Sequence, residues 1–337
     1  MGSLRAYIIT RVLLTIPMLL ILLTVVFIVL RVMPGDPAAA ILGAHAPQKQ
    51  IELLREQLGL NKPLIVQYFD YLSQLVRGDL GRSMIWGKRP VKVEIAEHFP
   101  ATVELTIGGM LVAIVIGVFT GAYAAHKRKS IADYGLRLYS IIVYSIPIFW
   151  LGMILQLIFG VYLRWFPVAG RIGVKMKPEH ITGLYILDSL ITRNWSSLLS
   201  ALKHLALPSI TLGLVLSGIF TRLTRANMLE VLQQDYIKAA RARGLSERVV
   251  VYKHALKNAF IPILTMMGLQ FALLLAGAVL TETTFSWPGM GRFLVERIEY
   301  RDFPSVQGAV VFFALLVAGV SLLVDIIYAY LDPRIRY

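Results

Sequence analysis

Six stretches of the chain are apolar for long enough to cross a lipid bilayer, and no other feature constrains its fold as strongly. A helix needs about 20 consecutive apolar residues to span the hydrocarbon core. Inside that core every backbone N–H and C=O must be hydrogen-bonded within the protein, which such a segment achieves as a helix. The expected spans are residues 12–32, 105–125, 138–163, 205–221, 259–281 and 306–330. We therefore predict an all-α polytopic membrane protein with six spans.

The composition supports this fold class and excludes several functions. The 337 residues are 57% hydrophobic and only 16% charged, whereas soluble domains are about 25% charged. No cysteine is present, so neither a disulfide nor a cysteine-ligated metal site can form. The net charge of +14 would favour nucleic-acid binding in a soluble protein. In a membrane protein it indicates basic loops beside anionic lipid, so we expect a lipid bilayer and no nucleic acid as partner, in a bacterial or archaeal cell membrane.

Prolines and glycines predict kinks and close helix packing in individual spans. Pro147 lies inside the third span, where we predict a kink. The fourth span is expected to be the shortest, and it carries Pro208. Small residues such as Gly117 and Gly121 in the second span allow close helix approach, or leave room for a pathway.

The basic residues predict the orientation in the membrane. Short loops rich in Lys and Arg stay on the cytoplasmic side. Lys127, Arg128 and Lys129 follow the second span, and a longer basic segment follows the fourth. With six spans, both chain ends are then also inside, so we expect an N-in and C-in topology.

The segment 222–261 between the fourth and fifth spans does not have the pattern of an irregular loop. It holds eight Lys and Arg against three Asp and Glu. Residues 235–243 have a helix-forming composition, and Gly244 stands where a helix C-terminus favours φ > 0. Ser246 can cap a second helix that carries Glu247 in its first turn. We predict a helix, a sharp turn and a second helix.

Residues 34–99 are too long for a plain connection between spans and contain two expected amphipathic helices, 48–58 and 63–76. Gly59 and Gly78 follow them as stop signals. The apolar positions on one face are Ile51, Leu54 and Leu58 in the first helix, and Leu64, Tyr68, Leu72 and Leu75 in the second. These faces are expected to pack on the outer side of the spans or on a partner.

No catalytic, cofactor-binding or metal site is predicted, so we expect a transport subunit and not an enzyme. The stretch GRSMIWGK, residues 81–88, has five residues between its glycines instead of the four of a P-loop, and Arg89 stands where a magnesium-binding Ser or Thr is needed. The histidines lack metal-ligand spacing; they are His45, His98, His126, His180, His204 and His254.

Carboxylates lie near the ends of the spans. Glu104 and Glu282 are at outer ends, and Asp325 is near the inner end of the last span. An intramembrane carboxylate is a functional candidate, but near a span end it can equally pair with a neighbour such as Arg334 or face water. A stand-alone secondary transporter driven by an ion gradient is the competing hypothesis, and it requires charged or unwound sites in mid-membrane.

The polar segment resembles the EAA loop of ABC-importer permeases. Lys238, Ala239 and Ala240 are followed by Gly244, and the segment ends at Pro262. Lys238 replaces the usual Glu, and Ile261 replaces the usual Leu. The stretch 234–246 looks like the variant found in peptide and nickel permeases.

Further motifs in family order look like the first permease subunit of dipeptide and oligopeptide importers. They are residues 31–37, 58–63, 77–81, 145–150, 281–291 and 331–334. The insertion around 181–188 is most similar to the dipeptide branch, while nickel and oligosaccharide branches stay open.

This resemblance implies a type-I ABC importer transmembrane domain. The implied division is an N-terminal tail with span 1 (1–33), an extracytoplasmic segment (34–99), a five-span core (100–331) that contains the 222–261 loop, and a cytoplasmic tail (332–337). The implied partners are a homologous second permease, two ATP-binding subunits that carry ATP and Mg, and an extracytoplasmic substrate-binding protein. This chain itself would bind no cofactor.

The resemblance also assigns residues to two sites. A coupling helix that docks into an ATPase groove would use Asp235, Tyr236, Lys238, Ala239, Ala240, Arg241, Arg243, Gly244 and Leu245. A possible outer gate would use Trp287, Pro288, Gly289 and Met290, although a rigid turn without substrate contact is the alternative. The basic outside loop 164–203 is expected to contact the binding protein, or else to pack as a lid on this subunit.

Overall fold

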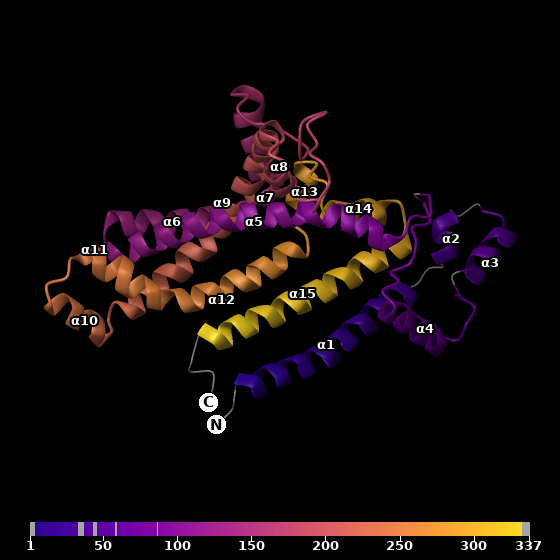
Figure 1. Cartoon of the computed structure of the whole chain (residues 1–337), viewed down its shortest axis with the longest axis horizontal. Helices are drawn as coiled ribbons and strands as arrows, with labels where there is room; N and C mark the ends of the chain where they lie inside the picture. The colour runs from indigo at the N-terminus through magenta and orange to yellow at the C-terminus, as the bar shows by residue number, and fades with distance from the viewer. Residues whose placement is uncertain (1–3, 33–36, 43–45, 58, 86, 332–337) are drawn as a thin grey trace.

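The computed structural model describes residues 4–32, 37–42, 46–57, 59–85 and 87–331. In those ranges the regular secondary structure is helical, with one isolated β-bridge between Arg82 and Pro90 and no named strand. Met33, Leu58 and the tail 332–337, which carry parts of the family motifs, lie outside the described residues. The elements in Figure 1 are α1 (Leu4–Val32), α2 (Pro37–Leu42), α3 (Gln48–Gln57), α4 (Leu64–Val76), α5 (Val91–His126), α6 (Ile131–Ser145), α7 (Ile148–Leu155), the π-helix η1 (Gln156–Tyr162), α8 (Tyr185–Ile191), α9 (Trp195–Val231), α10 (Asp235–Ala242), α11 (Glu247–Val249), the π-helix η2 (Val250–Ala255), α12 (Leu256–Leu275), α13 (Val279–Thr284), α14 (Met290–Glu299) and α15 (Phe303–Leu331).

Five helical segments in the described part of the chain are long and apolar enough to cross a membrane, and a bent pair can supply a sixth span. That pair is α6 with α7 and η1, which meet at 99°. The predicted kink at Pro147 is therefore a break. Pro147 excludes the helical conformation from the residue before it, and Ile146 is accordingly extended, with φ −73° and ψ 129°.

The expectation that the fourth span is the shortest is wrong, because α9 is a single helix of 37 residues. It begins inside the predicted outside loop, where the Asn194 side chain accepts a hydrogen bond from the N–H of Ser197 at 3.1 Å. It continues past Thr221 because residues 222–231 contain neither glycine nor proline and form helices readily. Pro208 is accommodated within this helix.

Helices α5 and α9 pack against each other along small side chains and form the centre of the molecule. A Cβ atom at Gly121 would lie 2.6 Å from the carbonyl oxygen of Thr221, which is closer than real Cβ atoms approach. A Cβ at Gly117 would overlap the side chain of Phe220. Glycine therefore sets the spacing of the two backbones. The core around them also contains Leu105, Met110, Leu212, Ile263, Met267 and Trp287.

The two predicted amphipathic helices are present as α3 and α4, and α4 packs on this chain's own spans. Tyr68 and Tyr71 of α4 contact Phe27 of α1, with ring centroids 5.3 and 5.6 Å apart. The same cluster includes Val311 of α15. The Tyr68 hydroxyl also lies 2.6 Å from that of Thr24.

Short helices lie at both ends of the long axis, and α7, α8 and α13 lie beside its middle (Figure 1). Figure 1 shows α10 and α11 at one end, toward which α1 begins and α15 finishes. Helices α2, α3 and α4 lie at the opposite end. This arrangement agrees with an even number of crossings between the start of α1 and the end of α15.

Candidate functional site

The predicted helix–turn–helix between the fourth and fifth spans is confirmed. Helix α10 covers Asp235–Ala242, and Gly244 has φ +77°, the left-handed conformation that glycine adopts at low cost. Ser246 occupies the capping position of α11 but makes no side-chain capping hydrogen bond. Glu247 instead accepts a 2.7 Å hydrogen bond from Arg241, which closes the turn.

Helix α10 is held in place by two buried side chains on one face. Ile237 is fully buried and Ala240 is nearly so. They pack with Ala122 and Ala125 at the end of α5. Because Ala240 faces the chain's own core, Ala239 is the alanine of this pair that stays exposed to a partner.

The remaining candidate residues of the coupling helix form an exposed ridge. Lys238 donates to Asp235 at 2.9 Å, and this hydrogen bond lowers the pKa of the Asp235 carboxyl. Asn258 donates to the Tyr236 hydroxyl at 2.7 Å and so ties α10 to α12. The exposed positions are Asp235, Tyr236, Lys238, Ala239, Arg241, Arg243, Gly244 and Leu245. Such a short helix with basic and small side chains suits a groove with acidic edges.

The four residues of the candidate outer gate form a tightly bonded turn between α13 and α14. Trp287 and Met290 are buried, whereas Pro288 is exposed. The indole N–H of Trp287 donates to the carbonyl oxygen of Ala101 at 2.8 Å. The backbone N–H of Met290 donates to the Thr102 hydroxyl at 2.8 Å. The turn is therefore fastened to α5 at two adjacent residues.

Glu282 organises this turn, a role that the sequence pattern does not indicate. Its side chain is fully buried, accepts a hydrogen bond from Thr102 at 2.7 Å, and accepts another from the N–H of Arg292 at 3.0 Å. A Cβ at Gly289 would collide with this carboxylate. Burial raises the pKa of Glu282 above its ordinary value, against the opposing hydrogen bonds from Arg292, Thr102 and the N–H of Gly291. The one signal for this role in the sequence is a carboxylate directly beside an apolar run.

The outside loop 164–203 is folded onto α5 by a buried ion pair. Arg171 contacts Glu104 at 2.7 Å, donates to the Gly183 carbonyl at 2.7 Å, and stacks 3.8 Å from the ring centroid of Tyr185. Glu104 also accepts from the N–H of Ile186 at 2.8 Å. One of the loop's basic residues thus serves internal packing, and Glu104 has a structural role.

Asp188 orders the middle of the same loop. Its buried carboxylate accepts hydrogen bonds from the Thr182 hydroxyl at 2.6 Å and from the N–H groups of Thr182 and Gly183. Burial would raise the pKa of Asp188, but these hydrogen bonds together hold it below its ordinary value. Exposed apolar side chains remain on the loop, among them Val174, which is 90% exposed.

Other charged groups near the helix ends also pair within the chain. Glu94 and Arg297 form a buried pair at 3.1 Å between α5 and α14. Asp325 lies 3.3 Å from Arg11 of α1. The alternative partner Arg334 lies outside the described residues.

Comparison with known families accounts for nearly the whole chain. Residues 113–337 match the family described as binding-protein-dependent transport system inner membrane component. Residues 4–106 match the N-terminal family of the same transport-system membrane components.

Several relatives are similar over almost their full length. A dipeptide transport system permease protein, DppB, of Alkalihalophilus pseudofirmus is 45% identical over 98% of this chain and 99% of its own. A di/tripeptide transport system permease protein, DppB, of Pseudomonas aeruginosa is 46% identical over 92% of this chain and 93% of its own. The glutathione transport system permease protein GsiC of Escherichia coli K12 is 41% identical over 98% of this chain and 99% of its own.

A solved structure shares the fold. The chain superimposes on the MetNI methionine ABC transporter in an inward-facing conformation with a TM-score of 0.54 and 15% identity, covering 72% of this chain and 97% of that one. The apolar helices, the helical fold and the two family matches lead to one conclusion. The chain is a multi-pass membrane protein with the type-I ABC importer fold, and it belongs to the family of binding-protein-dependent transport system inner membrane components.

Proposed function

We propose that this chain is one permease subunit of an ATP-driven importer for dipeptides and short oligopeptides. The observation that carries the proposal is the identity of 45–46% to permeases named for dipeptides and di/tripeptides, over 92–98% of this chain. The similarity to a glutathione permease is consistent with a small peptide as the transported substrate.

The proposal includes three kinds of partner. A homologous permease completes the translocation pathway, and two ATP-binding subunits hold ATP and Mg. One ATP-binding subunit docks on the exposed ridge of α10, in which Lys238, Arg241 and Arg243 meet acidic side chains. A substrate-binding protein docks on the loop 164–203, which lies with α8 beside the middle of α5 (Figure 1) and presents exposed apolar side chains such as Val174.

In the proposed mechanism this chain transmits motion and performs no chemistry. Closure of the ATP-binding subunits displaces α10, which is packed on the end of α5 through Ile237 and Ala240. The outer turn is bonded to the other half of α5 through Ala101 and Thr102. Displacement of α10 therefore changes the outer turn, and the pathway alternates between the two sides of the membrane.

The break between α6 and α7 is the feature that a secondary transporter would share, because such transporters bind ions at interrupted helices. Here the sequence 138–163 around the break contains no Asp, Glu, Lys or Arg. An ion-coupling site at Ile146 and Pro147 would lack a charged ligand, so the ATP-driven mechanism is favoured.

Reconstitution tests the proposal directly. The chain is co-expressed with a second permease, ATP-binding subunits and a binding protein of a dipeptide importer, and uptake of a labelled dipeptide into proteoliposomes is measured. We expect uptake that requires ATP and the binding protein. Uptake that persists without ATP and follows an ion gradient would contradict the proposal, as would uptake of nickel or an oligosaccharide in place of peptide.

A further inference from the structure

A cavity of about 250 Å³ lies at the end of the molecule opposite α10, between α4, the segment 79–84 and the beginning of α15. Its polar lining includes Asp79, Arg82 and Gln307, and its apolar lining includes Leu75, Leu80 and Val311. Nothing in the coupling helix, the outer turn or the loop 164–203 contributes to it, so it is separate from the sites described above.

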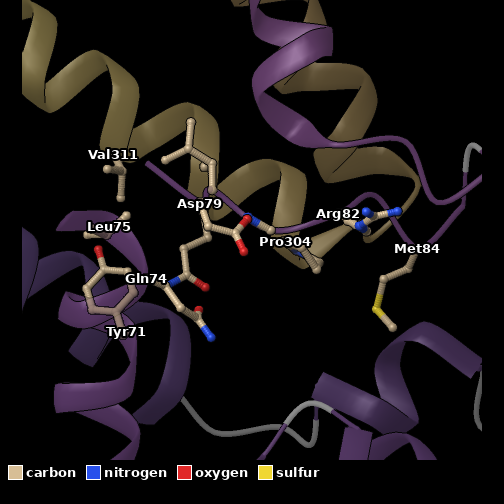
Figure 2. A pocket seen from close by; sticks show the side chains of 12 residues that line it. Tyr71, Gln74, Leu75, Asp79, Arg82, Met84, Pro304 and Val311 are labelled. Atoms are coloured by element: carbon tan, nitrogen blue, oxygen red, sulfur yellow. The ribbon is translucent and has the colours of Figure 1, made fainter. Parts of the chain in front are cut away.

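The segment 79–84 brings one acidic and one basic side chain, Asp79 and Arg82, to the cavity. Figure 2 shows Asp79 and Arg82 with Pro304 between them. One Asp79 oxygen accepts a hydrogen bond from the N–H of Gly81 at 2.9 Å. Neither Asp79 nor Arg82 forms an ion pair with any residue that the structure describes. A ligand that carries both a cation and an anion would match this pair of charges.

The cavity lies where a membrane span leaves the hydrocarbon. The apolar span of α15 begins at Phe303, and Pro304, Gln307 and Val311 are therefore in its first turns. Helix α1, which packs beside α15, has only 17% of its apolar window buried within this chain. The polar rim of the cavity is at the depth of lipid headgroups, while Leu75 and Val311 lead toward the acyl chains.

We propose that this cavity binds the phosphoethanolamine headgroup of a phospholipid, with the phosphate on Arg82 and the ammonium on Asp79. Arg is suited to phosphate because its planar guanidinium donates two parallel hydrogen bonds. The ammonium of ethanolamine can donate to the second Asp79 oxygen and to the side-chain oxygen of Gln307, whereas the quaternary ammonium of choline has no N–H.

Size and electrostatics favour a headgroup over a peptide. Pockets for drug-sized ligands measure about 300–1,000 Å³, so a cavity of about 250 Å³ suits a small headgroup better than an oligopeptide. Tyr71, which also lines the cavity, adds no negative charge, because a phenol is neutral at physiological pH and burial raises the pKa of this one further, to about 12. The phosphate is thus not repelled from that wall.

The test measures which lipids the full-length chain retains. The chain is placed in nanodiscs with equal parts of phosphatidylethanolamine, phosphatidylcholine and phosphatidylglycerol, exchanged into detergent, and analysed by native mass spectrometry. We expect phosphatidylethanolamine to be retained about ten-fold over each of the other two, which corresponds to about 1.4 kcal/mol. Equal retention of the three lipids would overturn the assignment.

Three variants test whether the charges of Asp79 and Arg82, and not the overall charge of this surface, determine which lipid is retained. Asp79→Asn keeps an oxygen for the Gly81 N–H and should abolish the preference for phosphatidylethanolamine over phosphatidylglycerol. Arg82→Gln should reduce retention of both by about ten-fold. Arg77→Gln, an exposed position outside the cavity lining, should change nothing. A loss with Arg77→Gln equal to that with Arg82→Gln would show nonspecific attraction and overturn the site.

Soluble competitors distinguish the source of the ligand. Glycerophosphoethanolamine should displace the retained lipid at a lower concentration than glycylglycine does. The opposite order would identify a site for peptide termini and overturn the lipid assignment. Neither result depends on ATP or on a transported substrate, so this inference and the proposed transport function can fail separately.

Discussion

The carboxylate of Asp133 accepts two hydrogen bonds from the guanidinium of Arg225, at 2.6 and 2.9 Å, and thereby fastens the first turn of α6 to α9. Asp133 is 1% exposed and Arg225 is 20% exposed. The same carboxylate accepts from the N–H of Lys129 at 3.0 Å. A two-bond pair of this kind is stronger and more directional than a single contact, so the loop 127–130 and the inner part of α9 form one unit.

Removing one partner of this pair should destabilise the protein strongly. Arg225→Gln leaves the buried carboxylate of Asp133 with only the more distant guanidinium of Arg137, whose Nε lies 3.7 Å away. We expect a cost of about 3 kcal/mol, the lower end for buried pairs, because Arg225 is partly exposed and Arg137 remains. Unfolding in detergent micelles measures the change. Arg89→Gln is the matched control, since Arg89 and Glu97 are also 2.6 Å apart but about half exposed, and it should change the free energy of unfolding far less. Equal effects of the two variants would contradict this interpretation.

Gly244→Val should uncouple ATP hydrolysis from transport. The positive φ of Gly244 strains any β-branched residue by about 1 kcal/mol or more, although no atom lies within 4 Å of the added Cβ. The strain should misdirect α10 and abolish transport while membrane insertion stays normal. Gly319→Val is the control, because Gly319 also has open space around it but lies within α15. Full transport by the purified Gly244→Val complex would refute the role of the turn.

Cysteine labelling should establish the orientation. A cysteine at Lys129 or Lys238 should be protected from an impermeant thiol reagent in intact cells, whereas one at Lys62 or Lys177 should react. All four side chains are exposed, and the chain has no native cysteine. Reaction at Lys238 without reaction at Lys62 would reverse the proposed orientation.

Glu282 should make stability fall as the pH rises above the acidic range. Its folded-state pKa is raised from the ordinary value of 4.5, so the folded protein binds this proton more tightly than the unfolded chain does. The stabilisation is fully present below pH 4.5 and is lost as the pH rises through the raised pKa. Melting temperatures of wild type and Glu282→Gln, measured across this window, should converge at low pH and differ above it. Parallel curves for the two proteins would exclude Glu282 as the titrating group.

Docking of the binding protein should depend on the exposed part of the loop 164–203. Val174→Asp should weaken binding-protein stimulation of ATP hydrolysis while the basal rate and the melting temperature stay unchanged, because Val174 is 90% exposed. Arg171→Gln should instead lower the melting temperature, since it breaks a buried pair with Glu104. Unchanged affinity for the binding protein with Val174→Asp and with a companion variant at Met176 would favour a lid on this subunit.

Local signals in the sequence were sufficient to predict α10 and the turn that follows it. The alanines of α10 and the glycine at 244 act over a few residues, and the structure agrees with both. Ser246 precedes the second helix as predicted, but its side chain makes no capping hydrogen bond. The long apolar runs likewise predicted the order of the spans, five of which are continuous helices in the described part of the chain, while the sixth is the bent pair of α6 with α7 and η1. The inward direction of Ala240 was not predictable, because it depends on the end of α5, which lies more than a hundred residues earlier in the chain.

Contacts between distant segments explain the remaining differences between the prediction from the sequence and the structure. Glu282 meets Thr102, and Arg171 meets Glu104, across separations that no local pattern encodes. The lengths of α5 and α9 were underestimated because hydropathy marks the apolar part of a helix and not its polar extensions. At Pro147 the sequence predicted a disturbance, but the angle of the break depends on how the two halves pack.

The close fit of α5 and α9 has a mechanical consequence. At about 1.5 Å per residue, the 36 residues of α5 form a strut about 54 Å long, stiffened by its partner where Gly117 and Gly121 seat the two backbones together. One end of the strut carries the cluster of Ile237, and the other part carries the bonds to Trp287 and Met290. If a rigid helix such as α5 rotates about a point between its ends, the two ends move in opposite directions. In the proposed mechanism the cytoplasmic and outer sides of the pathway therefore cannot open at the same time. The rigidity of the α5–α9 pair prevents leakage through the importer.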